Sequence, residues 1–187
     1  EHQDFAYSAY AAGRVLQDRF PEIESYCVVS YENKTLRIGE EYMQVAVDCV
    51  DSSFFHMFTI ELEQGDPRHV LATRDGVVIS SKFAKTLFGE ESPMGKVLDI
   101  DDRQLTVTGV FADFPYGIFR TPQLITSIFN TDNLWCIESY MDCHSWELFL
   151  MARRNADLPA KTESIRQCIK ETGDYAFSHD EKAILRP

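Results

Sequence analysis

The chain has 187 residues and a formal charge of −12, because 30 Asp and Glu residues outnumber 18 Lys and Arg residues. This acidic balance, with no cluster of basic residues, argues against a nucleic-acid partner and against unassisted binding to anionic lipid. A hydrophobic content of 44% indicates a packed globule, and no apolar run approaches the roughly 18 residues that a membrane-spanning helix needs.

The first 60 residues predict two helices and three strands. Apolar residues first recur at helical spacing until Pro21 stops the pattern, and alternation of period two follows. The expected elements are a helix over 3–20, strands over 24–34, 36–39 and 41–50, a turn at Asn33 and Lys34, and a short helix capped by Asp51 that buries Phe54, Phe55 and Phe58.

The stretch from Gly76 to Pro115 carries a local signal at each junction. The β-branched residues 77–79 predict a strand, and either Ser80 or Ser81 can cap the helix that follows it. Gly89 is placed to end this helix in a left-handed conformation. A hairpin comes next, with a reversal at Pro93 and Gly95, strands over 97–100 and 105–111, and a turn at 101–103.

The remainder of the chain mixes strands, turns and one helix. Before the stretch just described, a reversal of the chain at the surface is expected at Gly65, Asp66 and Pro67. After residue 115 the expected elements are a strand over 124–129, an irregular exposed segment over 131–141, a strand over 146–152, a turn over 153–157, a helix over 158–173 and a strand over 183–185.

The five cysteines form an odd set without close pairs, which is not the pattern of a disulfide framework. Cys136 and Cys143 lie seven residues apart and could pair, although the sequence does not supply the geometry. Buried free thiols are expected for the other three, Cys27, Cys49 and Cys168.

The sequence predicts no metal-binding, catalytic or cofactor-binding residue. Its five histidines are scattered. The run Asp99, Asp101, Asp102 resembles the start of a calcium loop, but Arg103 and Gln104 stand where such a loop needs an oxygen ligand and a glycine, so a solvated hairpin turn is the better interpretation. Ser80 and Ser81 do not stand at nucleophile–base spacing from Lys82 or Lys85, and the glycines form no phosphate-binding pattern. The chain itself is therefore not expected to bind or split ATP.

Seven phenylalanines admit two interpretations. They could line a groove for an apolar ligand, but their buried periodicities favour a small hydrophobic core. The set comprises Phe54, Phe55, Phe58, Phe83, Phe88, Phe111 and Phe114.

Five ordered motifs over residues 51–115 carry a family resemblance. They read DxxFFxxF, LxxGD, VVISxxxAxxLFG, PMGK and VTGVFxDFP, and they closely resemble the extracytoplasmic core domain of MacB-type, FtsX-like ABC transporter permeases. The flanking residues 1–50 and 120–187 are similar mainly in pattern. The family-motif positions, interpreted as structural, are Asp51, Phe54, Phe55, Phe58, Gly65, Asp66, Ser80, Ala84, Phe88, Gly89, Pro93, Gly95, Gly109, Val110 and Pro115.

The expected fold class is α+β with an insertion. Residues 1–52 plus 119–187 are expected to form a βαβ-rich subdomain, into which residues 53–118 insert a mostly-β subdomain. The resemblance implies the same division, into a porter-like unit that carries a sabre-like insertion.

The resemblance implies a non-enzymatic domain on the extracytoplasmic, periplasmic face of the bacterial inner membrane. Transmembrane helices would precede Glu1 and follow Pro187, and a separate cytoplasmic ATPase domain or subunit would bind ATP, so that this domain needs no cofactor. Motion would pass through the helices to this domain, which would contact a cargo or a periplasmic adaptor within a permease dimer. This mechanotransmission needs a rigid body joined to both helices, so the chain ends should lie close together.

Two other hypotheses remain. The chain could be a free-standing extracytoplasmic module that binds a small apolar ligand or a peptide in a pocket among the aromatic residues. A secreted hydrolase is disfavoured, because no nucleophile has a base at recognisable spacing. The sequence does not select a transported substrate or a periplasmic partner.

Overall fold

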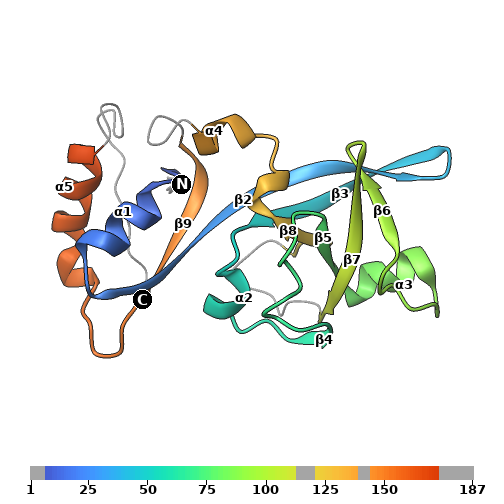
Figure 1. Ribbon diagram of the computed structural model, residues 1–187, viewed down its shortest axis with the longest axis horizontal. Coiled ribbons are helices and arrows are strands. Elements are labelled where there is room, and N and C mark those ends of the chain that lie inside the picture. The colour runs from blue at the N-terminus through green and yellow to red at the C-terminus, as the bar shows by residue number, and fades with distance from the viewer. Residues whose placement is uncertain (1–6, 113–120, 139–143, 173–187) are drawn as a thin grey trace, which may run out of the picture. The chain divides into compact units, whose positions relative to one another are not determined.

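The computed structural model describes residues 7–112, 121–138 and 144–172, and the chain in it forms two compact units. Unit 1 comprises residues 1–29 and 133–187, and unit 2 comprises residues 30–132 (Figure 1). The described chain contains both helices and strands, with most strand pairs antiparallel, which confirms the predicted α+β class.

Unit 1 is a small sheet with helices packed on it. Its strand β9 pairs antiparallel with both β1 and the first part of β2, with Val28 opposite Leu148. The elements are β1 (Tyr7–Ala9), α1 (Ala12–Arg19), the first part of β2 (Ile23–Ile38), α4 (Leu134–Glu138), β9 (His144–Ala152), the 3₁₀ turn η2 (Pro159–Lys161) and α5 (Thr162–Thr172).

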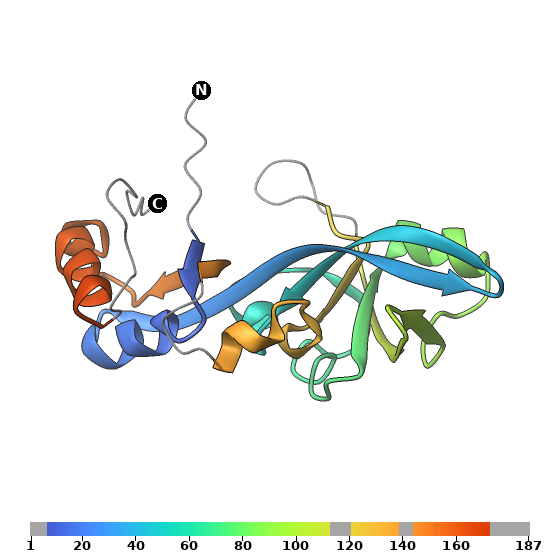
Figure 2. The same cartoon turned by 90° about the horizontal axis from the view of Figure 1, so that it is seen from above.

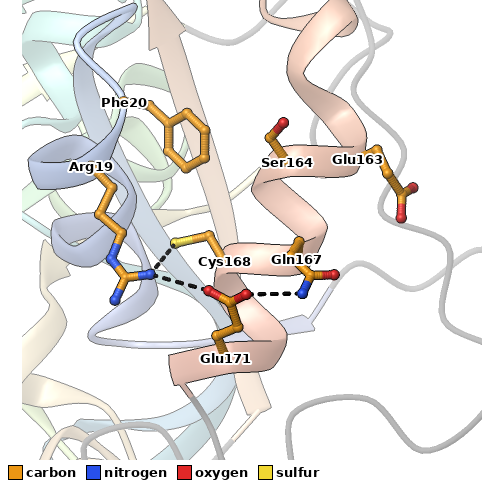
Figure 3. Close-up of a pocket in the computed structure, with 7 residues that line it drawn as sticks. All are labelled: Arg19, Phe20, Glu163, Ser164, Gln167, Cys168 and Glu171. Atoms are coloured by element: carbon orange, nitrogen blue, oxygen red, sulfur yellow. Dashed lines mark hydrogen bonds and ion pairs between the residues drawn. The ribbon is translucent and has the colours of Figure 1, made fainter.

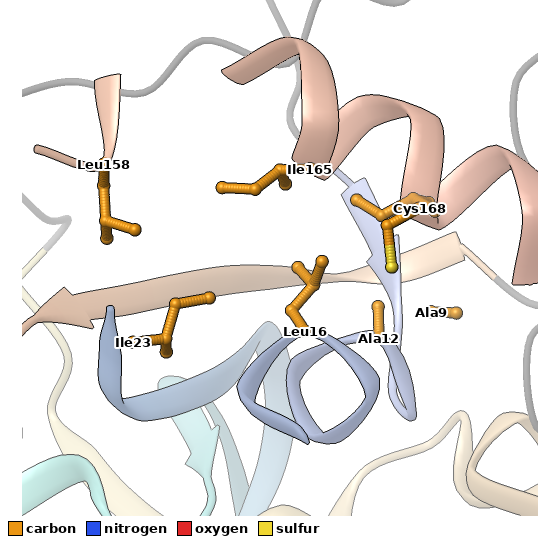
Figure 4. Packing of buried hydrophobic residues seen from close by; sticks show 8 residues of the cluster. Ala9, Ala12, Leu16, Ile23, Leu158, Ile165 and Cys168 are labelled. Atoms are coloured by element: carbon orange, nitrogen blue, oxygen red, sulfur yellow. The ribbon is translucent and has the colours of Figure 1, made fainter. Parts of the chain in front are cut away.

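The core of unit 1 joins the two ends of the described chain. Figure 4 shows side chains from β1, α1 and the start of β2 packed against side chains from α5 and from the segment before it. Burying each large aliphatic side chain stabilises the unit by about 1.5–3 kcal/mol. The cluster consists of Ala9, Ala12, Leu16, Ile23, Leu158, Ile165, Cys168 and Ile169.

Unit 2 is built on a ring of six strands. Its pairs run β2–β3–β8–β5–β7–β6 and return from β6 to β2, while β4 adds to the far end of β7. Ring closure gives each of these six strands a neighbour on both sides over part of its length. The elements are the second part of β2, β3 (Glu41–Val50), α2 (Phe54–Met57), β4 (Leu62–Gln64), β5 (Gly76–Ser80), α3 (Ser81–Phe88), β6 (Val97–Ile100), β7 (Arg103–Phe111), β8 (Leu124–Ser127) and the 3₁₀ turn η1 (Ile128–Asn130).

The β2–β3 hairpin extends past the other strands of unit 2 (Figure 2). Its end carries exposed apolar side chains, Ile38, Tyr42 and Met43. The buried side chains of unit 2 lie deeper in the ring, and the largest of them are Phe111, Leu36, Ile79, Ile100, Leu124, Ile125 and Ile128.

Several predicted elements are confirmed. Strand β3 spans the predicted residues 41–50, and β6 and β7 form the expected hairpin. The turn of this hairpin has positive φ at both Asp101 and Asp102, the conformation that a two-residue hairpin favours. Helix α3 is capped by Ser80, whose side chain accepts a hydrogen bond from the Phe83 N–H, and it ends at Gly89 with a φ of 60°.

Four local predictions differ from the structure, the first two because strand pairing overrides the sequence signal. Residues 7–9 form a strand rather than the start of a helix, because β9 pairs with them. Asn33 and Lys34 form no turn, because β2 continues to Ile38. Residues 128–130 form a 3₁₀ turn instead of continuing β8. The segment 131–141, expected to be irregular and exposed, contains α4 and buries Thr131 and Cys136, while Asp132, Leu134 and Trp135 are exposed as expected; residues 139–141 lie outside the described residues.

The boundaries of the two units differ from those of the predicted subdomains. The predicted subdomains were residues 1–52 plus 119–187, and residues 53–118. Residues 30–52 belong to unit 2, since the second part of β2 pairs with β6 and β3 pairs with β8. The porter-like and sabre-like division stays a prediction. No helix in the described parts of the chain is long and apolar enough to cross a membrane.

Candidate functional site

A buried ion pair on β2 is the most highly charged feature in the interior of unit 2. Glu32 and Lys34 are two residues apart on the strand, so both side chains project from the same face of β2. The Lys34 Nζ lies 2.8 Å from Glu32 Oε2, and the two side chains are only 5% and 7% exposed. A pair this deeply buried needs further hydrogen bonds to compensate for lost hydration.

Neighbouring groups supply those hydrogen bonds. Glu32 Oε1 accepts from Ser30 Oγ at 2.9 Å and also from Thr131 Oγ1, while Lys34 Nζ donates to Asp132 Oδ1 at 2.5 Å. A second carboxylate, Asp101, lies 3.4 Å from the same ammonium. We call this set the Glu32 cluster; it comprises Ser30, Glu32, Lys34, Asp101, Thr131 and Asp132.

The cluster keeps both members of the central pair charged. Burial lowers the pKa of Lys34, but hydrogen bonds to Asp132 and Glu32 outweigh burial and leave this pKa above its ordinary value. Burial raises the pKa of Glu32, but hydrogen bonds from Lys34, Thr131 and Ser30 outweigh it and leave that pKa below its ordinary value. A buried ion pair is thus maintained across neutral pH.

Cys49 on β3 lies next to the cluster. Its Sγ is 3.8 Å from Glu32 Oε2, and burial followed by the negative charge of Glu32 raises the pKa of the thiol well above its ordinary value. A thiol in this position is a poor nucleophile, because the reactive form is the thiolate.

A cavity of about 240 Å³ borders the cluster. Its polar groups bond to one another: Arg103 Nη1 donates to Asn130 Oδ1 at 3.5 Å, and Asn130 Nδ2 donates to Thr126 Oγ1 at 2.9 Å. The lining residues are Lys34, Ile100, Asp101, Arg103, Leu105, Thr126, Asn130 and Asp132.

Unit 1 contains a larger hollow of about 590 Å³ between α1 and α5 (Figure 3). Arg19 projects into it, with Nη1 at 3.6 Å from Cys168 Sγ and 3.7 Å from Glu171 Oε2. Its wall mixes charged, polar and aromatic side chains, Arg19, Phe20, Glu163, Ser164, Gln167, Cys168 and Glu171.

The motif residues form local structural contacts rather than one site. Asp51 Oδ1 accepts hydrogen bonds from the Ser53 N–H and hydroxyl just before α2, although this helix has no side-chain cap. Phe54 is buried, and its ring lies 5.4 Å from that of Phe55 and 5.0 Å from that of Phe58, both of which are only half-buried.

The other motif residues shape the turns and strands of unit 2. Gly65 has a φ of 102°, and a Cβ there would lie 3.0 Å from the Gly109 Cα, so these two glycines allow β4 and β7 to meet. Asp66 binds Arg68 and His69, and its hydrogen bonds with Arg68 hold the pKa of this carboxyl well below its usual range.

The remaining motif positions occupy the β5–α3–β6–β7 segment. Ser80, Ala84, Phe88 and Gly89 belong to α3 or its caps, and Pro93 and Gly95 lie in the turn that follows. Val110 pairs with both Ile79 and Gln64, whereas Pro115 lies outside the described residues.

Of the seven phenylalanines singled out in the sequence, the six that the structure describes line neither of these hollows. Phe83 and Phe111 are buried, which agrees with the interpretation as core, while the half-buried Phe88 faces Lys96, whose Nζ is 6.0 Å from the ring centroid. Phe114 lies outside the described residues.

Cys27, Cys49 and Cys168 are free and buried, as expected, and Cys136 is disulfide-bonded. Cys143, which the sequence allows as its partner, lies outside the part of the chain that the structure describes. Within that part, no three His, Cys, Asp or Glu side chains are grouped so that they could hold a metal ion.

The sequence analysis missed the Glu32 cluster. A signal was present, since Ser30, Glu32 and Lys34 alternate along a strand and so place opposite charges on one face. Their contact with Thr131 and Asp132, about 100 residues later, had no local signal.

Comparison with known proteins places the chain in a family. The family model described as the MacB-like periplasmic core domain matches residues 2–167. None of the curated proteins matches the chain significantly.

Solved structures share the fold. A domain of a protein described as a permease from Porphyromonas gingivalis is 18% identical with a TM-score of 0.77, and the match covers 93% of this chain and 75% of that one. The periplasmic region of MacB from Actinobacillus actinomycetemcomitans is 16% identical with a TM-score of 0.66, covering 90% and 75%. The extracellular domain of the noncanonic ABC-type transporter YknZ from Gram-positive bacteria is 15% identical with a TM-score of 0.66, covering 89% and 84%.

These TM-scores show a common fold, and the family match spans most of the sequence. The family's motifs, read above from residues 51–115, fall within the matched range. The chain belongs to the MacB-like periplasmic core domain family of ABC transporter permeases.

Proposed function

We propose that this domain works on the extracytoplasmic side of a membrane and transmits motion between flanking transmembrane helices and an extracytoplasmic partner or cargo. ATP is bound and split by a separate cytoplasmic ATPase domain or subunit, and this domain carries no cofactor and no catalytic site. The family membership supports the setting, and the packing of unit 1 supports the mechanism.

The observation that carries the proposal is that the first and last described segments share one core. Ala9 of β1 and Leu16 of α1 pack in the same cluster as Ile165 and Ile169 of α5. Displacement of either segment is therefore transmitted to the other through close-packed side chains, which deform little.

The position of unit 2 in the chain fits the same mechanism. It is inserted between the two parts of unit 1, at residues 30–132. Motion that enters at the chain ends reaches unit 1 first and continues to unit 2 through two chain connections. This arrangement suits transmission between packed states rather than the binding of a small ligand.

The predicted closeness of the termini remains a prediction, since residues 1–6 and 173–187 lie outside the described residues. Permease dimerisation and contact with a periplasmic adaptor are likewise part of the proposal.

A nucleotide-dependent distance measurement tests the proposal. Lys170, an exposed residue of α5, is replaced by a spin-labelled cysteine in the full-length permease, assembled with its ATPase in nanodiscs. The label-to-label distance in the dimer should change when ATP binds and return after hydrolysis. An ATPase variant that cannot bind ATP is the control and should show a constant distance.

Equal distances in all nucleotide states would contradict mechanotransmission. The alternative, a free-standing binding or sensor module, is tested by the coding sequence on either side of residues 1–187. A spanning helix on each side supports the permease, whereas a cleavable signal and a stop codon support the free-standing module.

A further inference from the structure

We infer that the Glu32 carboxylate holds together the two chain segments that connect unit 2 to the rest of the protein, so that both segments are fixed, or released, as one. The chain enters unit 2 at Ser30 and leaves it at Asp132. The inference goes beyond the proposed function, because it concerns unit 2 alone and is tested without transport.

The entering segment binds the carboxylate through the hydroxyl of Ser30. Ser30, the first residue of unit 2, donates its hydroxyl to Glu32 Oε1 at 2.9 Å and is itself buried. Ser30 and Glu32 alternate on β2, so this hydrogen bond stays on one face of the strand.

The leaving segment binds the same carboxylate. Thr131 donates its hydroxyl to Oε1, and the Asp132 N–H lies 3.3 Å from Oε1 and 3.2 Å from Oε2. A single side chain thus joins residues that are 100 positions apart in the sequence.

Lys34 gives the arrangement a second link. Its ammonium contacts both Glu32 Oε2, at 2.8 Å, and Asp132 Oδ1, at 2.5 Å. Asp101 in the β6–β7 turn accepts the Thr35 N–H at 2.9 Å, which fixes the same part of β2 to the ring. The two links share one ion pair, so the loss of Glu32 weakens both.

Because these groups are buried, the entering and leaving segments should be released together. Removing the carboxylate charge leaves the donors of Ser30, Thr131 and Asp132 weakly compensated and the Lys34 ammonium without its most buried carboxylate partner. Unpaired buried groups of this kind favour opening of the segments that carry them. The entering and leaving segments should therefore open in one event, although they are distant in sequence.

Native-state hydrogen exchange on the wild-type chain is the first test. Amides of residues 30–34 and the Asp132 amide should show the same opening free energy and the same dependence on low concentrations of urea. Different urea slopes for the two segments would mean separate openings and would overturn the inference.

Glu32→Gln tests the link directly. It should speed exchange about tenfold or more in both segments, the factor expected for the loss of a charge-assisted hydrogen bond. The control is Glu91→Gln, which makes the same chemical change in an exposed pair whose atoms lie 2.8 Å apart, and it should leave both segments unchanged.

Thr131→Val keeps the test decisive if Glu32→Gln does not fold. It removes one hydroxyl from the leaving segment and retains every charge. If the inference is right, exchange at Ser30 on the entering segment also accelerates. An effect confined to residues 131–135, or an equal acceleration throughout the chain, would overturn it.

Discussion

The Glu32 carboxylate gives the stability of unit 2 a defined dependence on pH. Its folded-state pKa is lowered, because hydrogen bonds from Lys34, Thr131 and Ser30 outweigh burial. A group with a lowered folded pKa stabilises the protein above its unfolded pKa, about 4.3 for Glu, and this contribution is lost as pH falls through the folded pKa.

Urea unfolding of the wild type and Glu32→Gln from pH 7 to pH 3 measures this contribution. The wild type should be more stable by a constant amount above about pH 5, and the difference should shrink below about pH 4.3. The other titratable groups at the site, Lys34, Asp101, Asp132 and Cys49, are present in both proteins. A difference that does not vary with pH would contradict the assignment.

The free cysteines are expected to react with a thiol reagent only after the protein unfolds. Cys27, Cys49 and Cys168 are buried, and burial raises the pKa of Cys49 further. If Cys136 is joined to Cys143, a thiol reagent should titrate three thiols in denaturant and five after reduction. Labelling of the native chain should be much slower than labelling of the denatured chain. Five thiols without reductant would contradict the pairing.

The helix α3 shows how one side chain determines an element boundary. The sequence offered Ser80 and Ser81 as caps, and the structure places the Ser80 Oγ at 3.2 Å from the Phe83 N–H. Ser81 instead donates to the exposed Glu63 Oε2 at 2.9 Å.

Ser80→Ala should therefore destabilise the protein by about 0.5–2 kcal/mol, the cost of losing an N-cap. Ser81→Ala is the matched control and should change stability by less than about 0.5 kcal/mol, as surface substitutions usually do. Urea midpoints of the two variants make the comparison. Equal losses would show that Ser80 does not act as the cap.

Two motif glycines are required for different reasons. Gly89 ends α3 with a φ of 60° and has open space where a Cβ would project. Gly65 has a φ of 102°, and its Cβ would lie 2.8 Å from the Thr108 carbonyl oxygen. Substitution at Gly65 thus adds a backbone clash to the conformational strain.

Gly89→Ala should cost about 1–3 kcal/mol, the range for a residue held in a glycine-favoured conformation. Gly65→Ala should cost more, because β4 and β7 must also move apart. Thermal unfolding of both variants measures the order. A smaller loss at Gly65 would mean that the β4–β7 contact does not need the glycine.

At the scale of the whole molecule, unit 1 should respond as one body to a change in its core. Leu16 is 1% exposed and lies in the cluster that joins α1 to α5. Leu16→Ala should cost about 2–5 kcal/mol in stability. Amide exchange should accelerate in α1 and α5 together, although they come from opposite ends of the chain.

The amides of β5, residues 76–80, belong to unit 2 and serve as the internal control. Their exchange should change less than that of α1 and α5. Equal acceleration in β5 would show that the two units unfold as a single cooperative body.

The sequence predicted those elements whose structure depends on residues close together in the chain. The cap and end of α3 and the 97–111 hairpin were predicted from the sequence, since their hydrogen bonds close within a few residues. The strand at 77–79 was predicted from its β-branched residue types, although its partners β7 and β8 are distant in sequence. The motifs that carry the family resemblance lie in this same stretch.

Contacts between distant segments determined the elements that the sequence did not predict. Residues 7–9 became a strand only because β9 pairs with them, and Lys34 lies in a strand interior, where three carboxylates balance its charge. Periodicity along the sequence reports which residues are buried but not which distant segment buries them. The sequence by itself therefore determined the family and the local elements, whereas the shared core of α1 and α5 and the Glu32 cluster required contacts that only the tertiary structure brings together.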